Sequence, residues 1–121
     1  MKAKVLIVED DEAVLETLQL MLEGEFNVIV ARNGAEAVNI FEFVKPDVVL
    51  MDIFLPEMDG VQATKEILKK DPNAIVIGIT AYARRRGRDL IEAGAREVLE
   101  KPFGRKLVID TIQKYLKDQN R

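Results

Sequence analysis

Several short apolar runs in this sequence are followed closely by a residue that can bind a metal ion or a phosphoryl group. Carboxylates are hard oxygen ligands for divalent cations, a hydroxyl can donate to a phosphoryl oxygen, and an ammonium group can neutralise one. Residues of all three kinds stand in these places, in chain order Glu9, Asp10, Asp52, Thr80 and Lys101. Together they indicate phosphoryl chemistry assisted by a divalent cation.

The clearest case is the apolar run at residues 48–51, which ends abruptly in Asp52. Its Val-rich composition, and the turn-rich segment 53–60 after it, predict a strand buried on both faces. Asp52 then lies at the carboxyl end of that strand. Open parallel sheets bind ligands at this edge, so Asp52 is a candidate nucleophile or metal ligand.

Missing residue types narrow the chemistry. The chain has no Cys, His or Ser. This excludes thiol nucleophiles, Cys/His zinc sites, Ser-His-Asp triads and any role as a histidine phosphodonor. The remaining reactive residues are Asp, Glu, Lys, Thr and Tyr. They favour a carboxylate nucleophile and a cation bound by oxygen ligands.

The elements that must position these residues alternate along the chain. Strand-like runs are expected at residues 4–8, 26–30, 48–51, 74–79 and 97–99, with helical periodicity between them and after the last. In the first helix, Val14, Leu18, Met21 and Leu22 are expected to face the core. Such alternation predicts right-handed crossovers and a parallel sheet covered on both faces. We therefore expect one α/β domain over residues 1–121: a three-layer α/β/α sandwich with five helices, whose five strands take the flavodoxin-like order 2-1-3-4-5.

In that order the first and third strands are neighbours, which brings Glu9, Asp10 and Asp52 together. Two carboxylates ~4 Å apart repel by roughly 4 kcal/mol at an effective dielectric of 20. A divalent cation relieves this repulsion, and an all-oxygen site without His or Cys favours Mg²⁺. Asp52 is then the carboxylate that can attack phosphorus, with Thr80 and Lys101 binding phosphoryl oxygens.

Each residue also has a simpler interpretation. The acids at 9–11 could cap a helix N-terminus, Asp52 could belong to a turn, Thr80 could bond backbone, and Lys101 could be solvated. Their joint placement at one sheet edge favours a site, because the simpler account needs several coincidences.

Four motifs, over essentially the whole chain, resemble the response regulator receiver domains of two-component signalling. They are Val5-Leu6-Ile7-Val8-Glu9-Asp10-Asp11, Asp52-Ile53-Phe54-Leu55-Pro56-Glu57-Met58-Asp59-Gly60, Thr80-Ala81 and Lys101-Pro102-Phe103. Each motif is weak alone, but four in order at these separations are highly specific.

The resemblance implies a role for each matching position. Asp52 is the expected phosphoacceptor. Mg²⁺ is expected on Asp10, on Asp52, on Glu9 through water and on the backbone carbonyl of Phe54. The donor would be a phosphohistidine on a sensor histidine kinase or histidine phosphotransfer protein, and phosphorylation would switch binding to a downstream protein.

The same resemblance makes Thr80 the switch hydroxyl and Lys101 the phosphoryl-binding lysine, with a cis Lys101-Pro102 bond. One position departs from the family. Many receivers have an aromatic residue three positions before this lysine, and Val98 stands there. Its side chain cannot make the aromatic swing that reports phosphorylation. Phe54 is bulky for its place, and we interpret it as a shield that slows hydrolysis of the acyl phosphate.

An arginine-rich run, Arg84-Arg85-Arg86-Gly87-Arg88, begins the fourth helix. It is either a solvated face or, with Tyr82 and Val98, part of a surface for an acidic partner. The net charge of −3 disfavours nucleic acid. No apolar run approaches the ~20 residues of a membrane span. Met1 leads almost directly into a strand-like run, which leaves no room for a signal peptide, so a cytoplasmic location is expected. The short polar tail favours a stand-alone receiver over one excised from a longer regulator.

Three other functions would each require a different set of residues. An aspartate-nucleophile phosphohydrolase of similar fold would have Asp-x-Asp-x-Thr after the first strand, whereas Asp10 is followed by Asp11-Glu12-Ala13-Val14. A flavin-binding module would need a Gly- and hydroxyl-rich loop there. An unphosphorylated interaction module would be expected to lack one of the acids, Thr80 or Lys101, and all are present.

Overall fold

The computed structural model describes residues 1–81 and 83–119, except for the side chains of residues 83–85 and 119. Strands and helices alternate, as the sequence predicts. The strands are β1 (Lys4–Val8), β2 (Asn27–Ala31), β3 (Val48–Met51), β4 (Val76–Thr80) and β5 (Glu97–Glu100). The helices are α1 (Glu12–Leu22), α2 (Gly34–Val44), α3 (Gly60–Lys70), α4 (Ala83–Ala93) and α5 (Arg105–Gln119).

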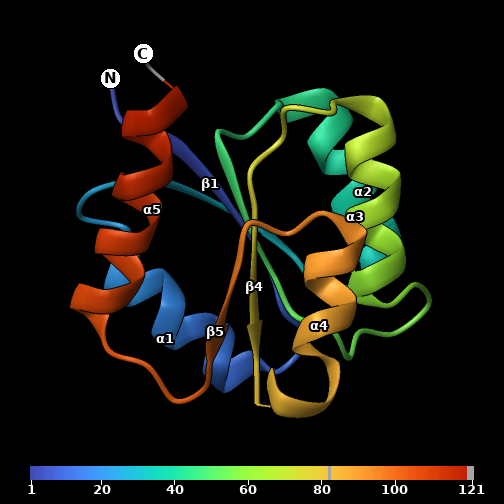
Figure 1. The fold of residues 1–121 in the computed structure, drawn as a ribbon. Coiled ribbons are helices and arrows are strands. Elements are labelled where there is room, and N and C mark those ends of the chain that lie inside the picture. Colours follow the sequence, from blue (N-terminus) through green and yellow to red (C-terminus); the bar gives the residue numbers. More distant parts are fainter. Residues whose placement is uncertain (82, 120–121) are drawn as a thin grey trace.

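The sheet has the order β2-β1-β3-β4-β5 with every pair parallel, which confirms the predicted topology. Helices α1 and α5 cover one face, and α2, α3 and α4 cover the other (Figure 1). The strand order reverses direction once, between β1 and β3, because β2 lies on one side of β1 and the chain then crosses to β3 on the other side. The carboxyl ends of these two neighbouring strands therefore form the switch point where ligands bind in such sheets.

Alternation along the central strands divides the core into two layers. In β1, Val5 and Ile7 pack toward α1 and α5, while Leu6 and Val8 pack toward α2 and α3. All four residues of β3 are buried. Strands buried on both faces read as continuous apolar runs. This explains why these strands are visible in the sequence and why their ends hold the reactive residues in place.

Some predicted details differ from the structure. The fourth strand begins at Val76 rather than residue 74, because the Ala74 N–H bonds the Asp71 carbonyl in a turn (3.0 Å). The second strand begins one residue late, because the Phe26 N–H bonds the Leu22 carbonyl after α1. The buried residues of α1 are Leu15, Leu18 and Leu22, whereas Val14 and Met21 are partly buried.

Among the helices that start at the edge holding the reactive residues, α1, α2 and α3 each have a side-chain cap. Asp11, Asn33 and Asp59 accept hydrogen bonds from backbone N–H groups of α1, α2 and α3, respectively. Such caps satisfy N–H groups that a helix leaves unpaired. The capping interpretation therefore holds for Asp11, and it leaves Glu9 and Asp10 available for another role.

Gly60 allows the start of α3 to pack directly against the end of β3. Its N–H bonds the Ile53 carbonyl at 2.8 Å, and a β-carbon at Gly60 would lie 1.8 Å from the backbone oxygen of Asp52. Gly60→Ala is expected to lower the free energy of unfolding by about 2 to 3 kcal/mol in urea titrations, because backbone must move. Gly24→Ala is the control, since nothing lies within 4 Å of a β-carbon there. Equal stability of the two variants would contradict this account.

Candidate functional site

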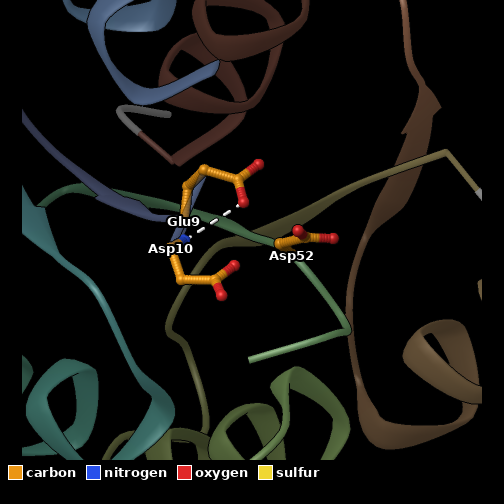
Figure 2. Close-up of side chains that lie close together, drawn as sticks. All are labelled: Glu9, Asp10 and Asp52. Atoms are coloured by element: carbon orange, nitrogen blue, oxygen red, sulfur yellow. Dashed lines mark hydrogen bonds between the residues drawn. The ribbon is translucent and has the colours of Figure 1, made fainter. Parts of the chain in front are cut away.

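Three carboxylates meet at the carboxyl ends of β1 and β3. Glu9 and Asp10 directly follow β1, and Asp52 directly follows β3 (Figure 2). One carboxylate oxygen from each lies within 4.8 Å of the others. The Val8–Met51 pairing at the end of the β1–β3 register fixes this proximity. The structure thus brings together the acids that the sequence analysis selected.

The three acids differ in burial. Glu9 is 1% exposed and Asp52 is 6% exposed, whereas Asp10 is exposed. Glu9 Oε2 accepts hydrogen bonds from the backbone N–H groups of Asp10 (3.1 Å) and Asp11 (3.3 Å). The first of these bonds is drawn in Figure 2. Glu9 is therefore fixed by backbone, while Asp10 presents its carboxylate to solvent.

Asp52 is held from both sides. Its N–H bonds the Val8 carbonyl at 3.1 Å, and its Oδ1 accepts a hydrogen bond from the Ile53 N–H at 2.8 Å. Its other carboxylate oxygen, Oδ2, faces the ammonium group of Lys101 at 3.2 Å. One oxygen of Asp52 is thus oriented by backbone and the other by a cation.

Lys101 links the two buried acids. Its Nζ donates to Glu9 Oε1 as well as to Asp52 Oδ2, and its side chain is 19% exposed. The Lys101 N–H bonds the Thr80 carbonyl at 2.9 Å, which ties this residue to the end of β4. The Lys101-Pro102 peptide bond is cis, as the family resemblance implies.

The charges in this group alter each other's pKa values. Burial, together with the nearby Asp52 charge, raises the pKa of the Glu9 carboxyl above its ordinary value, although Lys101 opposes the shift. Burial alone would lower the pKa of Lys101. The hydrogen bond to Glu9 and the charges of both acids outweigh burial and raise that pKa. Lys101 is therefore a cation at neutral pH.

The donor set fits Mg²⁺. It consists of carboxylate oxygens, one of them on an exposed residue, and Mg²⁺ binds few protein ligands while retaining several waters. An ion here would also balance the negative charge that Lys101 leaves, since the cluster has three carboxylates and Lys101 pairs with two of them.

The remaining predicted residues occupy different surroundings. Thr80 is fully buried at the end of β4, and Phe54 lies two residues past Asp52 with 48% of its surface exposed. Val98 pairs with Gly78 in the sheet and is partly buried against the core. Tyr82 and the side chains of Arg84 and Arg85 lie outside the described residues.

One contact near the site was not predicted. The guanidinium carbon of Arg86, on α4, lies 5.7 Å from the centroid of the Phe54 ring. In the sequence, Arg86 stands out only as one member of an arginine run. The contact depends on how the loop after β3 folds toward α4, for which the sequence contains no periodic signal.

Comparison with known proteins gives matches over nearly the whole length of the chain. The family model for the response regulator receiver domain matches residues 5–113. Chemotaxis protein CheY of Listeria monocytogenes is 38% identical over 117 residues, which cover 93% of this chain and 98% of that protein. The Bacillus subtilis CheY is 38% identical over 120 residues, covering 96% and 99%, respectively.

Solved structures have the same fold. The receiver domain of sensor histidine kinase PA1611 from Pseudomonas aeruginosa, with a magnesium ion in its active site cleft, has a TM-score of 0.92 and 29% identity, covering 97% of this chain and 99% of its own. The CheX-CheY-BeF3-Mg complex from Borrelia burgdorferi gives a TM-score of 0.87 and 31% identity, covering 94% and 89%, respectively. With its sheet order, its acidic site and these relatives, the chain belongs to the response regulator receiver domain family of two-component signalling.

Proposed function

We propose that Asp52 accepts a phosphoryl group from a phosphohistidine on a sensor histidine kinase or histidine phosphotransfer protein. The observation that carries this proposal is the pairing of Lys101 Nζ with Asp52 Oδ2, at 3.2 Å, beside two further carboxylates. This arrangement puts a nucleophilic oxygen, a cation and the ligands for a metal ion at one sheet edge.

The reaction is a phosphoryl transfer between residues. An Asp52 oxygen forms the new O–P bond as the P–N bond to the donor histidine breaks, and the electron pair of that bond stays with the imidazole. Lys101 is within reach of a phosphoryl oxygen on Asp52, where it neutralises charge. Such transfers depend mainly on positioning and charge stabilisation.

Glu9, Asp10, Asp52 and the Phe54 backbone carbonyl would hold Mg²⁺. When bound, the ion neutralises charge on the acids and on the transferring phosphoryl group. Because Asp10 is the exposed member of the cluster, it is the ligand most accessible to an entering ion. Glu9, held by two backbone N–H groups, would act on the ion mainly through water.

Phosphorylation of Asp52 then serves as a signal, and no metabolite is turned over. The buried Thr80 hydroxyl binds a phosphoryl oxygen, and a changed surface alters binding to a downstream protein. The chain assists only its own phosphorylation and dephosphorylation.

No described helix is long and apolar enough to cross a bilayer. We propose that residues 1–121 form one receiver domain that acts in the cytoplasm, with a surface including Tyr82, Arg84, Arg85 and Val98 for its target.

Phe54 is assigned a protective role at this site. Its ring, two residues past Asp52 and half-exposed, is suited to limit the access of water to the acyl phosphate. An unchanged phosphoryl half-life in Phe54→Asn would rule this role out.

The proposed function is tested by incubating the protein with acetyl phosphate and Mg²⁺ and measuring its intact mass. One phosphoryl group is expected to be added, and excess EDTA is expected to prevent the addition. Absence of any adduct, or an adduct that forms equally well in EDTA, would overturn the proposal.

A further inference from the structure

The side chain of Phe54 is joined to α4 by a short chain of contacts. The Arg86 guanidinium lies over the Phe54 ring at 5.7 Å, within the range of a cation–π interaction. The Arg86 Nε also donates to Asp89 Oδ2 at 2.6 Å. Arg86 thus forms an ion pair within α4 and also contacts the loop that follows Asp52.

These contacts matter because the side chains of Phe54, Arg86 and Asp89 are all partly exposed, so that packing alone does not fix them. Phe54 is 48% exposed, and the Arg86 and Asp89 side chains are 36% and 45% exposed, respectively. A half-exposed aromatic ring keeps alternative rotamers unless a neighbour selects one. In the described structure the guanidinium of Arg86 is a neighbour that can make this selection.

Helix α4 is intrinsically weak at the end that carries Arg86. Its first turn contains no acidic residue to complement the helix dipole, and Gly87 follows directly in the helix interior. Ordering of this end therefore depends on contacts with the rest of the protein. The pair with Phe54 is such a contact, and it connects this end of α4 to the loop of the phosphoacceptor.

We propose that Arg86 is a positioning residue for the site: held by Asp89, it keeps the Phe54 ring beside Asp52 and so prolongs the life of the phosphoryl group. This inference rests on the proposed function. The lifetime of the phosphoryl group then depends on α4. The contact responsible does not require an aromatic residue at position 98, which Val98 occupies.

The test compares phosphoryl half-lives after removal of acetyl phosphate, followed by intact mass. Arg86→Gln keeps a similar length but removes the cation. We expect it to shorten the half-life by about two- to fivefold, the size that a cation–π contact at a partly exposed site can supply. Arg88→Gln, an exposed arginine on the same helix, is the matched control and should leave the half-life unchanged.

A double variant shows whether Arg86 acts through Phe54. If it does, Phe54→Asn with Arg86→Gln has the half-life of Phe54→Asn alone, because the contact is already lost. Arg86→Lys, which keeps a cation over the ring, should retain most of the wild-type half-life. A wild-type half-life in Arg86→Gln, or full additivity in the double variant, would overturn the proposal.

A second readout separates this inference from the proposed function. In the unphosphorylated protein, Arg86→Gln should speed amide hydrogen exchange in the loop at residues 53–58 by about two- to fivefold, and Arg88→Gln should not. If the wild-type chain takes up no phosphoryl group, the proposed function fails, and loop exchange still decides the role of Arg86. Unchanged loop exchange would refute that role.

Discussion

Replacing Lys101 by methionine is expected to lower the free energy of unfolding by about 3 to 5 kcal/mol at neutral pH in metal-free buffer. Lys101 is the cation that contacts both Glu9 and Asp52, and these acids are 1% and 6% exposed. Methionine fills a similar volume without charge. The variant therefore leaves two buried carboxylates facing each other with no counter-charge, which is the costly outcome of removing one partner from a buried ion pair.

The loss of stability in Lys101→Met should depend on pH. The pKa of Glu9 is raised in the folded protein, so this group favours folding when protonated, and its contribution is lost as pH rises through the raised value. Removing Lys101 removes interactions that lower this pKa and so raises it further. The gap between wild type and Lys101→Met is thus largest at neutral pH and narrows as pH falls toward the ordinary glutamate range of about 4.

Urea unfolding at several pH values measures this effect. Lys106→Met is the control, because Lys106 pairs with Asp110 across an exposed surface of α5 and should leave stability almost unchanged. Added Mg²⁺ should recover part of the Lys101→Met deficit by supplying positive charge. A deficit equal to that of the control, or one independent of pH, would contradict the electrostatic account of the site.

Asp10→Asn is expected to have opposite effects without and with magnesium. Without metal it should be as stable as wild type or more so, because it removes one of three mutually repelling carboxylates. With magnesium, wild type should gain about 1.4 kcal/mol when the ion is at ten times its dissociation constant. The variant should gain almost nothing, since the exposed ligand of the cluster is gone.

Thermal unfolding across a magnesium titration measures both effects. Asp11→Asn makes a close control: it removes a neighbouring negative charge, and asparagine can still accept the Val14 N–H hydrogen bond that caps α1. This control should keep the magnesium-dependent rise in Tm. The same rise in Asp10→Asn would show that Asp10 does not hold the ion.

The fold and the cluster of acids could be predicted because they follow from local rules. The apolar runs of β1 and β3 are buried on both faces and stand out in the sequence, and alternation with helices implies a parallel sheet. Once these strands are neighbours, Glu9, Asp10 and Asp52 must meet at one edge. The starts of β2 and β4 lie one and two residues later than predicted, because the backbone N–H groups of Phe26 and Ala74 form hydrogen bonds in the preceding turns.

Features that depend on side-chain placement were not predictable in this way. The sequence does not reveal that Lys101 bridges Glu9 and Asp52, nor that Glu9 is fixed by backbone while Asp10 stays exposed. The contact between Phe54 and Arg86 requires the conformation of an irregular loop. The Lys101 bridge and the Phe54–Arg86 contact join segments far apart in the chain, and no periodic pattern encodes them.

The central claim, that Asp52 is the phosphoacceptor, is tested most directly by one comparison. Wild type and Asp52→Asn are incubated with acetyl phosphate and Mg²⁺, and the intact mass of each is measured. Asparagine preserves the shape of the side chain but lacks the nucleophilic carboxylate. The account predicts a single phosphoryl group on wild type and none on the variant. A phosphoryl group that persists in Asp52→Asn would contradict it.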